Sequence, residues 1–207
     1  MPRKFAEIAF TPAVKVLQDR YGSRQTYENF VAKGPANDKI TTAISQFITE
    51  RNGFYLSTVT SEGWPYVQFR GGPPGFLRVL DEQTLGFADF AGNSQYLSTG
   101  NLTENNRVFL FLMDYANRRR LKIWGHATVS HDDPALIERL KVPGYSGQAE
   151  RAILIQVVAW DRNCPQHIPV KYSEHEVAQM VEPLQARIAE LEAQLAQAQK
   201  STNLKRW

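Results

Sequence analysis

The sequence predicts a mainly β protein, an antiparallel barrel with flanking helices. Segments rich in β-branched and aromatic residues follow one another from Phe54 to Ala127, and a further apolar segment runs from Ile153 to Val158. These residue types favour strands. Nearly all the intervals between the strands of the first stretch are short and polar, which is typical of an antiparallel barrel.

Composition narrows the class of protein further. The chain has 207 residues, of which 43% are hydrophobic and 22% charged, enough for one substantial core. Its net charge of +3 is not gathered into Lys/Arg blocks, so we expect no nucleic-acid partner. No apolar run has the length of a signal peptide or a membrane span, and we expect a cytoplasmic protein without membrane association. The four histidines show no HxxxH or CxxC spacing, so we expect no metal.

The first fifty residues predict helices. Thr11 and Pro12 form an N-cap and first-turn pair, and Gly22 stands where that helix should end. A second helix should begin after Asp38, because an apolar stripe follows it. The stretch from Tyr27 to Gly34 has no clear period, which leaves a loop or one short helical turn.

The strands are then expected in order, with a short helix from Leu97 to Asn101 before the fifth. They are Phe54 to Thr60, Pro65 to Arg70, Phe76 to Leu80, Thr84 to Phe87, Val108 to Leu112, Leu121 to Ala127 and Ile153 to Val158. The most apolar of them, around Phe109 to Leu112, should be buried on both faces or lie at a subunit contact.

The second strand carries the first candidate site residue. Alternation places Tyr66, Gln68 and Arg70 on one face and the apolar side chains on the other. That polar face is either solvated or directed at a ligand. Arg70 is followed by Gly71 and Gly72, which allow close approach, and an arginine beside such a backbone suits a phosphate. The glycines could equally serve the turn alone.

Two further stretches offer ligand contacts. Asn93, Ser94 and Gln95 precede the short helix, where free N–H groups and the helix dipole favour a phosphate oxygen, although the same residues make an ordinary N-cap. Arg120 and Lys122 share one face of the sixth strand. The neighbouring arginines 118 and 119 are expected at the hairpin tip, in solvent.

These segments together carry a resemblance to a known family. The quoted motifs are Gly63-Trp64-Pro65-Tyr66-Val67-Gln68-Phe69-Arg70, Gly92-Asn93, Gly100-Asn101-Leu102-Thr103-Glu104-Asn105-Asn106-Arg107-Val108 and Arg120-Leu121-Lys122-Ile123-Trp124-Gly125-His126-Ala127. In this order the sequence resembles the pyridoxamine 5'-phosphate oxidase-like family of FMN-binding split barrels over about residues 40 to 170. The resemblance implies a six-stranded Greek-key split barrel, a homodimer, and FMN bound between the subunits.

The resemblance also assigns cofactor contacts. Arg70 matches the arginine that opens the family's phosphate-binding strand, and Arg78 matches the basic residue that closes it. Arg120 stands where the oxidases have a glutamine that reaches the flavin. Asn93 to Gln95 replace a basic pair of the oxidases, and Trp160 resembles a tryptophan near the flavin. The full expected set is Gln68, Phe69, Arg70, Gly71, Arg78, Asn93, Ser94, Gln95, Arg120, Lys122, Trp160 and Arg162.

The segment from Trp160 to Pro169 is polar and bounded by proline. It resembles the Asn-Cys-Pro-x-x-Ile tail of one branch of these flavoproteins, distinct from the true pyridoxamine phosphate oxidases. Cys164, the single cysteine of the chain, is expected to be a small buried hydrophobe, with a redox role as the alternative.

The C-terminal region changes character. We expect residues 1–172 to form the FMN-binding barrel domain and 173–207 to form an amphipathic helix and tail. Apolar residues recur there at the four-and-three spacing of a coiled coil, which favours self-association; packing on the chain's own barrel is the alternative. Pro183 should begin the regular helix or kink a longer one.

The function implied by the resemblance is that of an FMN-dependent oxidoreductase acting on an unidentified small substrate. The cofactor would carry the chemistry and the protein would supply position and charge. The sequence shows no convincing nucleophile, triad or paired carboxylates, so no catalytic residue is assigned. The alternative is a non-enzymatic module that binds flavin or another small ligand.

Overall fold

The structure, a computed structural model, describes residues 2–162 and 165–204, with side chains described up to residue 199. Contacts divide the chain into two compact units, one of Met1–Asp114 with Arg118–Gln166 and one of Tyr115–Asn117 with His167–Trp207. Each unit is described by itself. The expected division of the chain after residue 172 stays a prediction.

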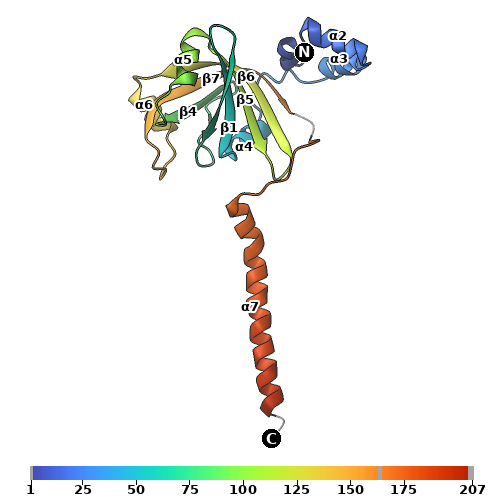
Figure 1. The fold of residues 1–207 in the computed structure, drawn as a ribbon, viewed down its shortest axis with the longest axis vertical. Helices are drawn as coiled ribbons and strands as arrows, with labels where there is room; N and C mark the ends of the chain where they lie inside the picture. Colours follow the sequence, from blue (N-terminus) through green and yellow to red (C-terminus); the bar gives the residue numbers. More distant parts are fainter. Residues whose placement is uncertain (1, 163–164, 205–207) are drawn as a thin grey trace. The chain divides into compact units, whose positions relative to one another are not determined.

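The first unit is built on one antiparallel sheet of seven strands (Figure 1). The strand order is β2-β1-β5-β6-β7-β4-β3, and the sheet does not close into a complete barrel. The expected number of six is therefore corrected to seven, because the two-residue β3 pairs with β4 through Arg78 and Val79. The strands are β1 Gly53–Val59, β2 Pro65–Gly71, β3 Arg78–Val79, β4 Thr84–Phe90, β5 Arg107–Asp114, β6 Arg119–Ser130 and β7 Ala149–Arg162.

The core lies on the inner face of this sheet. Along β5 burial alternates, with Leu110 and Leu112 fully buried while Phe109 and Phe111 lie half-buried on the outer face. The expectation that this strand is buried on both faces is wrong, since a sheet with one face on the core alternates in this way. The alternative, a subunit contact through Phe109 and Phe111, stays a prediction. The expected alternation of β6, with Leu121 inside, is confirmed.

Three helices accompany the strands. Helix α4 (Thr42–Thr49) begins at Thr41, whose side-chain oxygen accepts a hydrogen bond from the backbone N–H of Ile44. Its buried Ile44 and Ile48 join the main core, and Figure 1 shows α4 at one end of β1 and β5. Helix α5 (Leu97–Glu104) contacts β1 and β6, and α6 (Pro134–Leu140) contacts β4 and β7.

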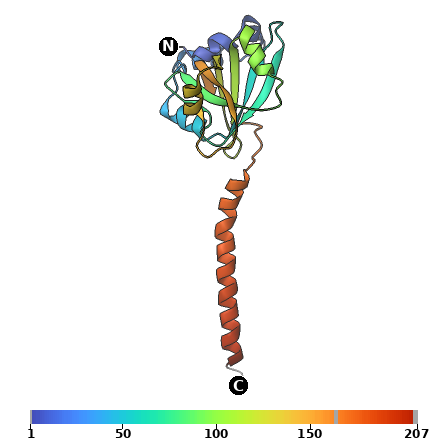
Figure 2. The same cartoon turned by 90° about the vertical axis from the view of Figure 1, so that its left-hand side faces the viewer.

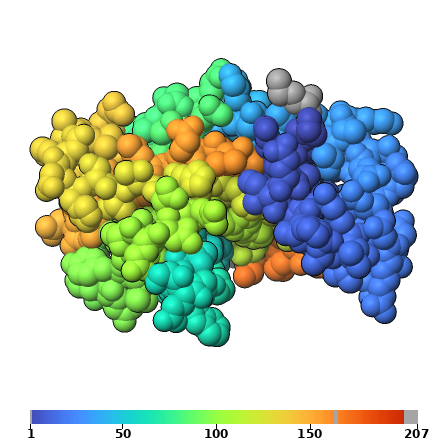
Figure 3. All heavy atoms as spheres, turned by 90° about the horizontal axis from the view of Figure 1, so that it is seen from above, coloured from blue at the N-terminus to red at the C-terminus, as the bar shows by residue number. Residues whose placement is uncertain are grey.

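The N-terminal segment forms α1 (Lys4–Ala9), α2 (Pro12–Arg20) and α3 (Arg24–Ala32). Thr11 caps α2 as expected, and Gly22 follows its end in the left-handed conformation. Helix α3 occupies most of the stretch left open as loop or turn. The ring of Phe5 stacks on Trp124 of β6, so these helices cover part of the outer face. Figure 3 shows them gathered at one end of the barrel unit.

The second unit is dominated by one long helix, α7 (Glu174–Leu204), seen in Figure 2. Pro183 lies inside this helix, where it removes one backbone hydrogen bond. The apolar stripe expected from the sequence is exposed along its length, at Val177, Val181, Leu184, Ile188, Leu191 and Leu195. In the part of the chain that is described, no helix combines the length and apolar character needed to cross a membrane.

Candidate functional site

A small pocket beside α5, here called the α5 pocket, brings four of the expected cofactor residues together. Gln68 and Arg70 enter it from β2, and Asn93 and Ser94 enter it from the loop after β4. The pocket encloses about 40 Å³. The other residues that line it are Asp89, Phe90, Gly92, Tyr96, Leu97, Ser98, Thr99, Glu150 and Arg151.

The alternation of β2 explains how polar side chains reach this pocket. Gln68 and Arg70 are half-buried on the inner face, while Val67 and Phe69 are 56% and 59% exposed. The possibility that the polar face is solvated is therefore wrong. The ring of Phe69 lies where a Cβ on Gly53 or Gly71 would stand, 2.3 and 2.9 Å from those positions. Gly71 thus accommodates Phe69 on the outer face.

Arg70 forms an ion pair with Asp89, which also faces Arg151. All three side chains are at most 14% exposed, and the Arg151 Nε lies 3.2 Å from the Asp89 Oδ2. Arg151 also pairs with Glu150, and its guanidinium lies 5.0 Å from the ring centre of Tyr96. Among the described residues the buried Nε of Arg70 has no hydrogen-bond partner, while the Nε of Arg151 is ion-paired with Asp89 without the geometry of a hydrogen bond. Donors therefore exceed acceptors in this cluster.

The Arg70–Asp89 pair also links two distant parts of the sheet. Strand β2 ends the sheet on one side, while Asp89 lies on β4 beyond its short pairing with β3. The pair thus connects the two ends of an open sheet through side chains. We call this junction the seam.

Burial dominates the electrostatics of Asp89. Desolvation raises the pKa of its carboxyl above the ordinary value, Arg70 and Arg151 lower it, and Glu150 adds a smaller raising effect. Burial therefore outweighs the two guanidinium groups, and the carboxyl of Asp89 keeps its proton to a higher pH than an exposed aspartate does. Protonation of Asp89 would release Arg70 for another anion.

The start of α5 supplies further donors. Its N-cap residue, Tyr96, is in the left-handed conformation with φ of 54° and makes no side-chain cap hydrogen bond. Ser94 also has a positive φ, of 59°. The first N–H groups of a helix have no partner within the helix, and they favour an anion together with the helix dipole. Nearby, the Ser98 hydroxyl donates to the Gln68 side chain over 2.8 Å.

Arg78 and Trp160, both expected at the flavin, make structural contacts elsewhere. Arg78 donates to the backbone oxygens of Leu140 and Lys141, at 3.4 and 2.7 Å. The Trp160 ring is 8% exposed and its N–H donates to the Lys39 backbone oxygen over 2.8 Å. Neither residue lines the α5 pocket.

Four more expected residues also lie outside the α5 pocket. Lys122 on the outer face forms an ion pair with Asp161 at 2.8 Å. Gln95 is exposed, and Arg120 and Arg162 line a different pocket beside α4. Contacts of these residues with a flavin stay predictions, and Cys164 lies outside the described residues.

Sequence reasoning missed Asp89 and Arg151, the most buried charges of the site. The signal for Asp89 is a single carboxylate in an otherwise apolar strand, since β4 is buried from Leu85 to Asp89. Its partner Arg151 stands directly opposite on β7, a pairing of opposite charges across two strands. Among the described residues, no group of three or more His, Cys, Asp or Glu side chains is arranged to hold a metal ion.

The chain matches a known family over most of this fold. Residues 40–162 match the family model described as pyridoxamine 5'-phosphate oxidase, and this range is more than half of the chain. The chain therefore belongs to that family. A search of curated proteins found no match.

Solved structures were found that are similar to this chain at low sequence identity. HupZ of Group A Streptococcus is 17% identical, with a TM-score of 0.50, and the match covers 64% of this chain and 99% of that one. An FMN-binding protein of Syntrophomonas wolfei is 11% identical, with a TM-score of 0.48 and coverage of 70% and 96%. A third structure, from Lactobacillus delbrueckii, carries the name pyridoxamine 5'-phosphate oxidase with the qualifier of a provisional assignment. It is 21% identical, with a TM-score of 0.46 and coverage of 60% and 94%.

Proposed function

We propose that this protein is an FMN-binding flavoprotein that holds the cofactor's phosphate in the α5 pocket. The observation that carries the proposal is the excess of buried donors there. Two guanidinium groups, Arg70 and Arg151, share the buried carboxylate of Asp89, and the adjoining helix start has no side-chain cap. Charge-assisted bonds from arginine and free N–H groups at a helix start are the usual means of binding phosphate. Membership of the family supports FMN as the source of that phosphate.

The residues present fit a phosphate group. The Nε of Arg70 has no hydrogen-bond partner among the described residues and can donate a further hydrogen bond. Side chains of Asn93, Ser94 and Thr99 supply neutral donors around the same space. A phosphate that enters this space competes with Asp89 for Arg70. Its affinity is therefore set by the balance between the two anions, and not by the arginine alone.

The proposed activity is that of an oxidoreductase acting on an unidentified small substrate. When bound, FMN supplies hydride or electron transfer. The chain's own contribution is to hold and orient the phosphate end, and to keep the charge of the pocket near balance with Asp89 and Glu150. No residue is assigned as a catalytic acid, base or nucleophile. A module that binds a ligand without turnover is the alternative.

We propose in addition that two barrel units form a homodimer through the outer face. Tyr55 pairs with Phe69 on one side and with Phe111 on the other, so these aromatic side chains form one continuous patch with Val67 and Phe109. Tyr55, Val67 and Phe69 are 40% to 59% exposed. A continuous exposed apolar surface of this kind is typical of a protein contact.

This arrangement bears on the expected FMN contacts of β6. Lys122 stands opposite Phe111 and Arg120 opposite Met113, so both cations border the patch. A second subunit on the outer face would bring them to the interface. The expectation that Arg120 and Lys122 reach a flavin shared between subunits is consistent with that placement, and it requires the homodimer.

We propose that α7 forms a parallel two-stranded coiled coil with the same helix of the second chain. The exposed stripe places Val181 and Ile188 at a positions and Leu184 and Leu191 at d positions, the combination that favours two parallel strands. In this register Arg187 occupies a g position. The e position that it faces on a parallel partner is Glu192, which has the opposite charge. This register therefore places apolar residues along the contact between the two helices and opposite charges beside it.

The absorption spectrum of the purified protein tests the central proposal. Oxidised flavin bands, with FMN released on denaturation, are expected. A colourless protein that cannot be reconstituted with added FMN would instead favour a module for a different ligand. Both variants Arg70→Ala and Arg118→Ala are then reconstituted with FMN. Weaker FMN binding in Arg70→Ala than in Arg118→Ala is expected if the phosphate lies at Arg70.

A further inference from the structure

Tyr96 combines two unusual features at the edge of the α5 pocket. Its backbone lies in the left-handed region, with φ of 54° and ψ of 20°, and the residue is 52% exposed. A residue with a bulky side chain rarely takes this conformation, whereas glycine and asparagine take it more readily. The side chain does not compensate as a helix cap, since it makes no cap hydrogen bond. A tyrosine at this position therefore needs another explanation.

The ring of Tyr96 lies over an arginine of the same pocket. Its centre is 5.0 Å from the guanidinium carbon of Arg151, within the range of a cation–π interaction. Arg151 stands on β7, lines the α5 pocket and is 7% exposed. An arginine side chain has several rotatable bonds, so its donors keep one direction only where contacts hold the plane of the guanidinium. The contact with Tyr96 therefore bears on how Arg151 meets a ligand.

Three contacts of two kinds hold the guanidinium of Arg151. Asp89 pairs with its Nε and Glu150 with one of its Nη atoms, while Tyr96 lies against a face of the group. The two carboxylates fix the guanidinium but also offset its positive charge. The aromatic ring fixes it without adding a negative charge. A guanidinium has five N–H donors, more than these two ion pairs use, so donors remain for an anion in the pocket.

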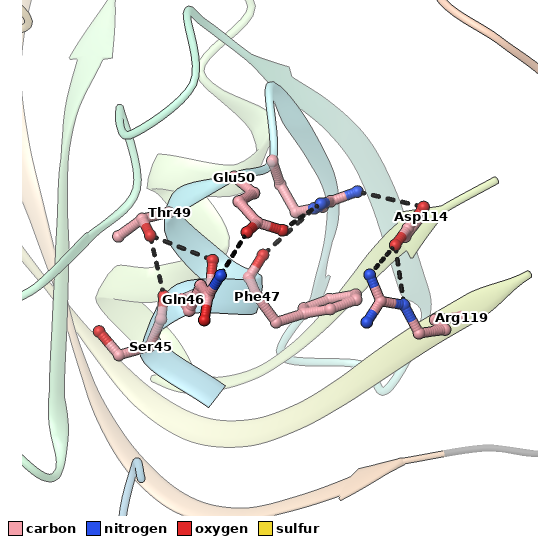
Figure 4. Close-up of polar contacts among 8 residues, drawn as sticks. Ser45, Gln46, Phe47, Thr49, Glu50, Asp114 and Arg119 are labelled. Atoms are coloured by element: carbon pink, nitrogen blue, oxygen red, sulfur yellow. Dashed lines mark hydrogen bonds and ion pairs between the residues drawn. The ribbon is translucent and has the colours of Figure 1, made fainter. Parts of the chain in front are cut away.

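A similar arrangement at α4 has a purely structural role. Phe47 lies beside the guanidinium groups of Arg51 and Arg119, whose central carbons are 4.9 and 5.7 Å from the ring centre. Both arginines pair with the buried carboxylate of Asp114, and Figure 4 shows the Phe47 ring pointing toward Arg119 and Asp114. Phe47 is half-buried within a helix. Tyr96 differs, because it is exposed, has a strained backbone and lies over an arginine of the proposed phosphate site.

We propose that Tyr96 is a positioning residue for the anion in the α5 pocket. Its ring holds the plane of the Arg151 guanidinium, so that the donors not used by Asp89 and Glu150 keep a fixed direction toward a phosphate ester. The left-handed backbone brings the ring to this place, and strain of this kind is typical of functional sites. The inference rests on the proposed function, because Tyr96 acts on the ligand only through Arg151.

Calorimetric titration of the full chain with FMN and with sulfate tests the proposal. Tyr96→Phe keeps the ring and should bind both like the wild type. Tyr96→Asn removes the ring and relieves the backbone, so both should bind about threefold to tenfold more weakly while Tm stays the same or rises. Wild-type affinity in Tyr96→Asn, an equal loss in Tyr96→Phe, or a fall in Tm together with the affinity would overturn the proposal. A wild-type protein that binds neither FMN nor sulfate would instead reject the proposed function, and this inference with it.

A spectroscopic signal and two control variants make the test specific. The NMR resonance of the Arg151 Nε–H, identified by its loss in Arg151→Lys, should move in Tyr96→Asn and keep its position in Tyr96→Phe, because an aromatic ring shifts the resonances of groups over its face. Tyr21 also lies over an arginine, Arg20, at 5.7 Å, but outside the α5 pocket. Tyr21→Asn should therefore leave both affinities within about twofold.

Phe47→Leu should lower Tm, because it removes a packed ring, and leave both affinities unchanged. A loss of affinity in either control as large as that in Tyr96→Asn would reject the specific role of Tyr96. An Arg151 resonance that does not move in Tyr96→Asn would reject the contact itself.

Discussion

The α5 pocket and the pocket beside α4 are both lined by arginines, but they differ in where the balancing carboxylate stands. In the α5 pocket Asp89 lies between Arg70 and Arg151, so an entering anion must compete with it. In the pocket beside α4, Asp114 holds Arg119 and Arg51 from outside the cavity, and the guanidinium of Arg120 lies over the Phe111 ring on the outer face. The comparison teaches that an arginine in a cavity indicates an anion site only after its own carboxylate partners are counted.

Removal of the carboxylate from the α5 pocket should have the largest effect on stability. Asp89→Asn leaves two buried guanidinium groups without their shared acceptor but also removes a carboxylate whose burial is costly, so we expect a net loss of about 1–3 kcal/mol in the free energy of unfolding. Added sulfate should restore part of that loss, because it can replace the missing charge. Denaturant unfolding with and without sulfate measures both effects. Glu138→Gln, which removes an exposed pair with Lys141, is the control and should stay within about 0.5 kcal/mol. An Asp89→Asn variant with the same free energy of unfolding as the wild type would contradict the proposed network of buried charges.

The next largest effect concerns the affinity for FMN. Arg70→Ala should weaken FMN binding by roughly 1.5–3 kcal/mol, because it removes a charge-assisted bond to the phosphate. Arg118→Ala, at the hairpin between β5 and β6, should stay within about 0.5 kcal/mol. Fluorescence titration of folded protein measures both. Equal losses in the two variants would remove Arg70 from the site.

The pH dependence of anion binding should report the protonation of Asp89 in the α5 pocket. Burial raises the pKa of Asp89, so as pH falls toward that pKa the carboxyl is protonated and releases Arg70. Sulfate, which stays fully charged over this range, should therefore bind the α5 pocket more tightly as pH falls, by at most about tenfold per pH unit. Because its pKa is raised on folding, Asp89 holds this proton more strongly in the folded state than in the unfolded state. The contribution of Asp89 to stability therefore falls as pH rises through that pKa.

Calorimetric titrations with sulfate at a series of pH values measure this slope. In Asp89→Asn the part of the slope that comes from this carboxyl should vanish, since no group remains there to titrate. A slope that is unchanged in Asp89→Asn would assign the titration to another residue.

The smallest effect is expected from the C-terminal helix. Deletion of residues 182–207 should leave a dimer of barrel units that still binds FMN, because every residue of both pockets precedes residue 163. Light scattering and the flavin spectrum of the truncated protein measure this. A monomer would show that α7 is the main association element, and a simultaneous loss of FMN would tie the cofactor to that association.

The sequence predicted elements with strong local signals. Thr11 and Pro12 marked the start of α2, and the period-two pattern of β6 placed Leu121 inward. The alternating pattern of β2 placed Gln68 and Arg70 on one face of the strand, but it could not show that this face is the inner one. The reason is physical: the apolar partners of Val67 and Phe69 lie on the outer patch, and the partner of Arg70 is Asp89, which is 19 residues away.

The remainder of the site depends on contacts that no local pattern encodes. The pairing of Asp89 with Arg151 requires the register of β4 against β7, strands separated by α5, β5, β6 and α6. Arg78 looked like a phosphate ligand, yet it binds backbone oxygens at the end of α6. A positive side chain in a sequence does not reveal whether a carboxylate, a carbonyl or a ligand will face it.

The seam gives Arg70 two roles that pull in opposite directions. The same guanidinium joins the ends of the open sheet and binds the proposed anion. A substitution that strengthens one of these two interactions therefore weakens the other. Replacing Asp89 by a neutral residue would favour the anion and weaken the junction, whereas a second carboxylate would strengthen the junction and exclude the anion. Natural variation at position 89 is therefore expected to be narrow, and tighter binding should evolve through the loop from Gly92 to Gln95, where no such conflict arises.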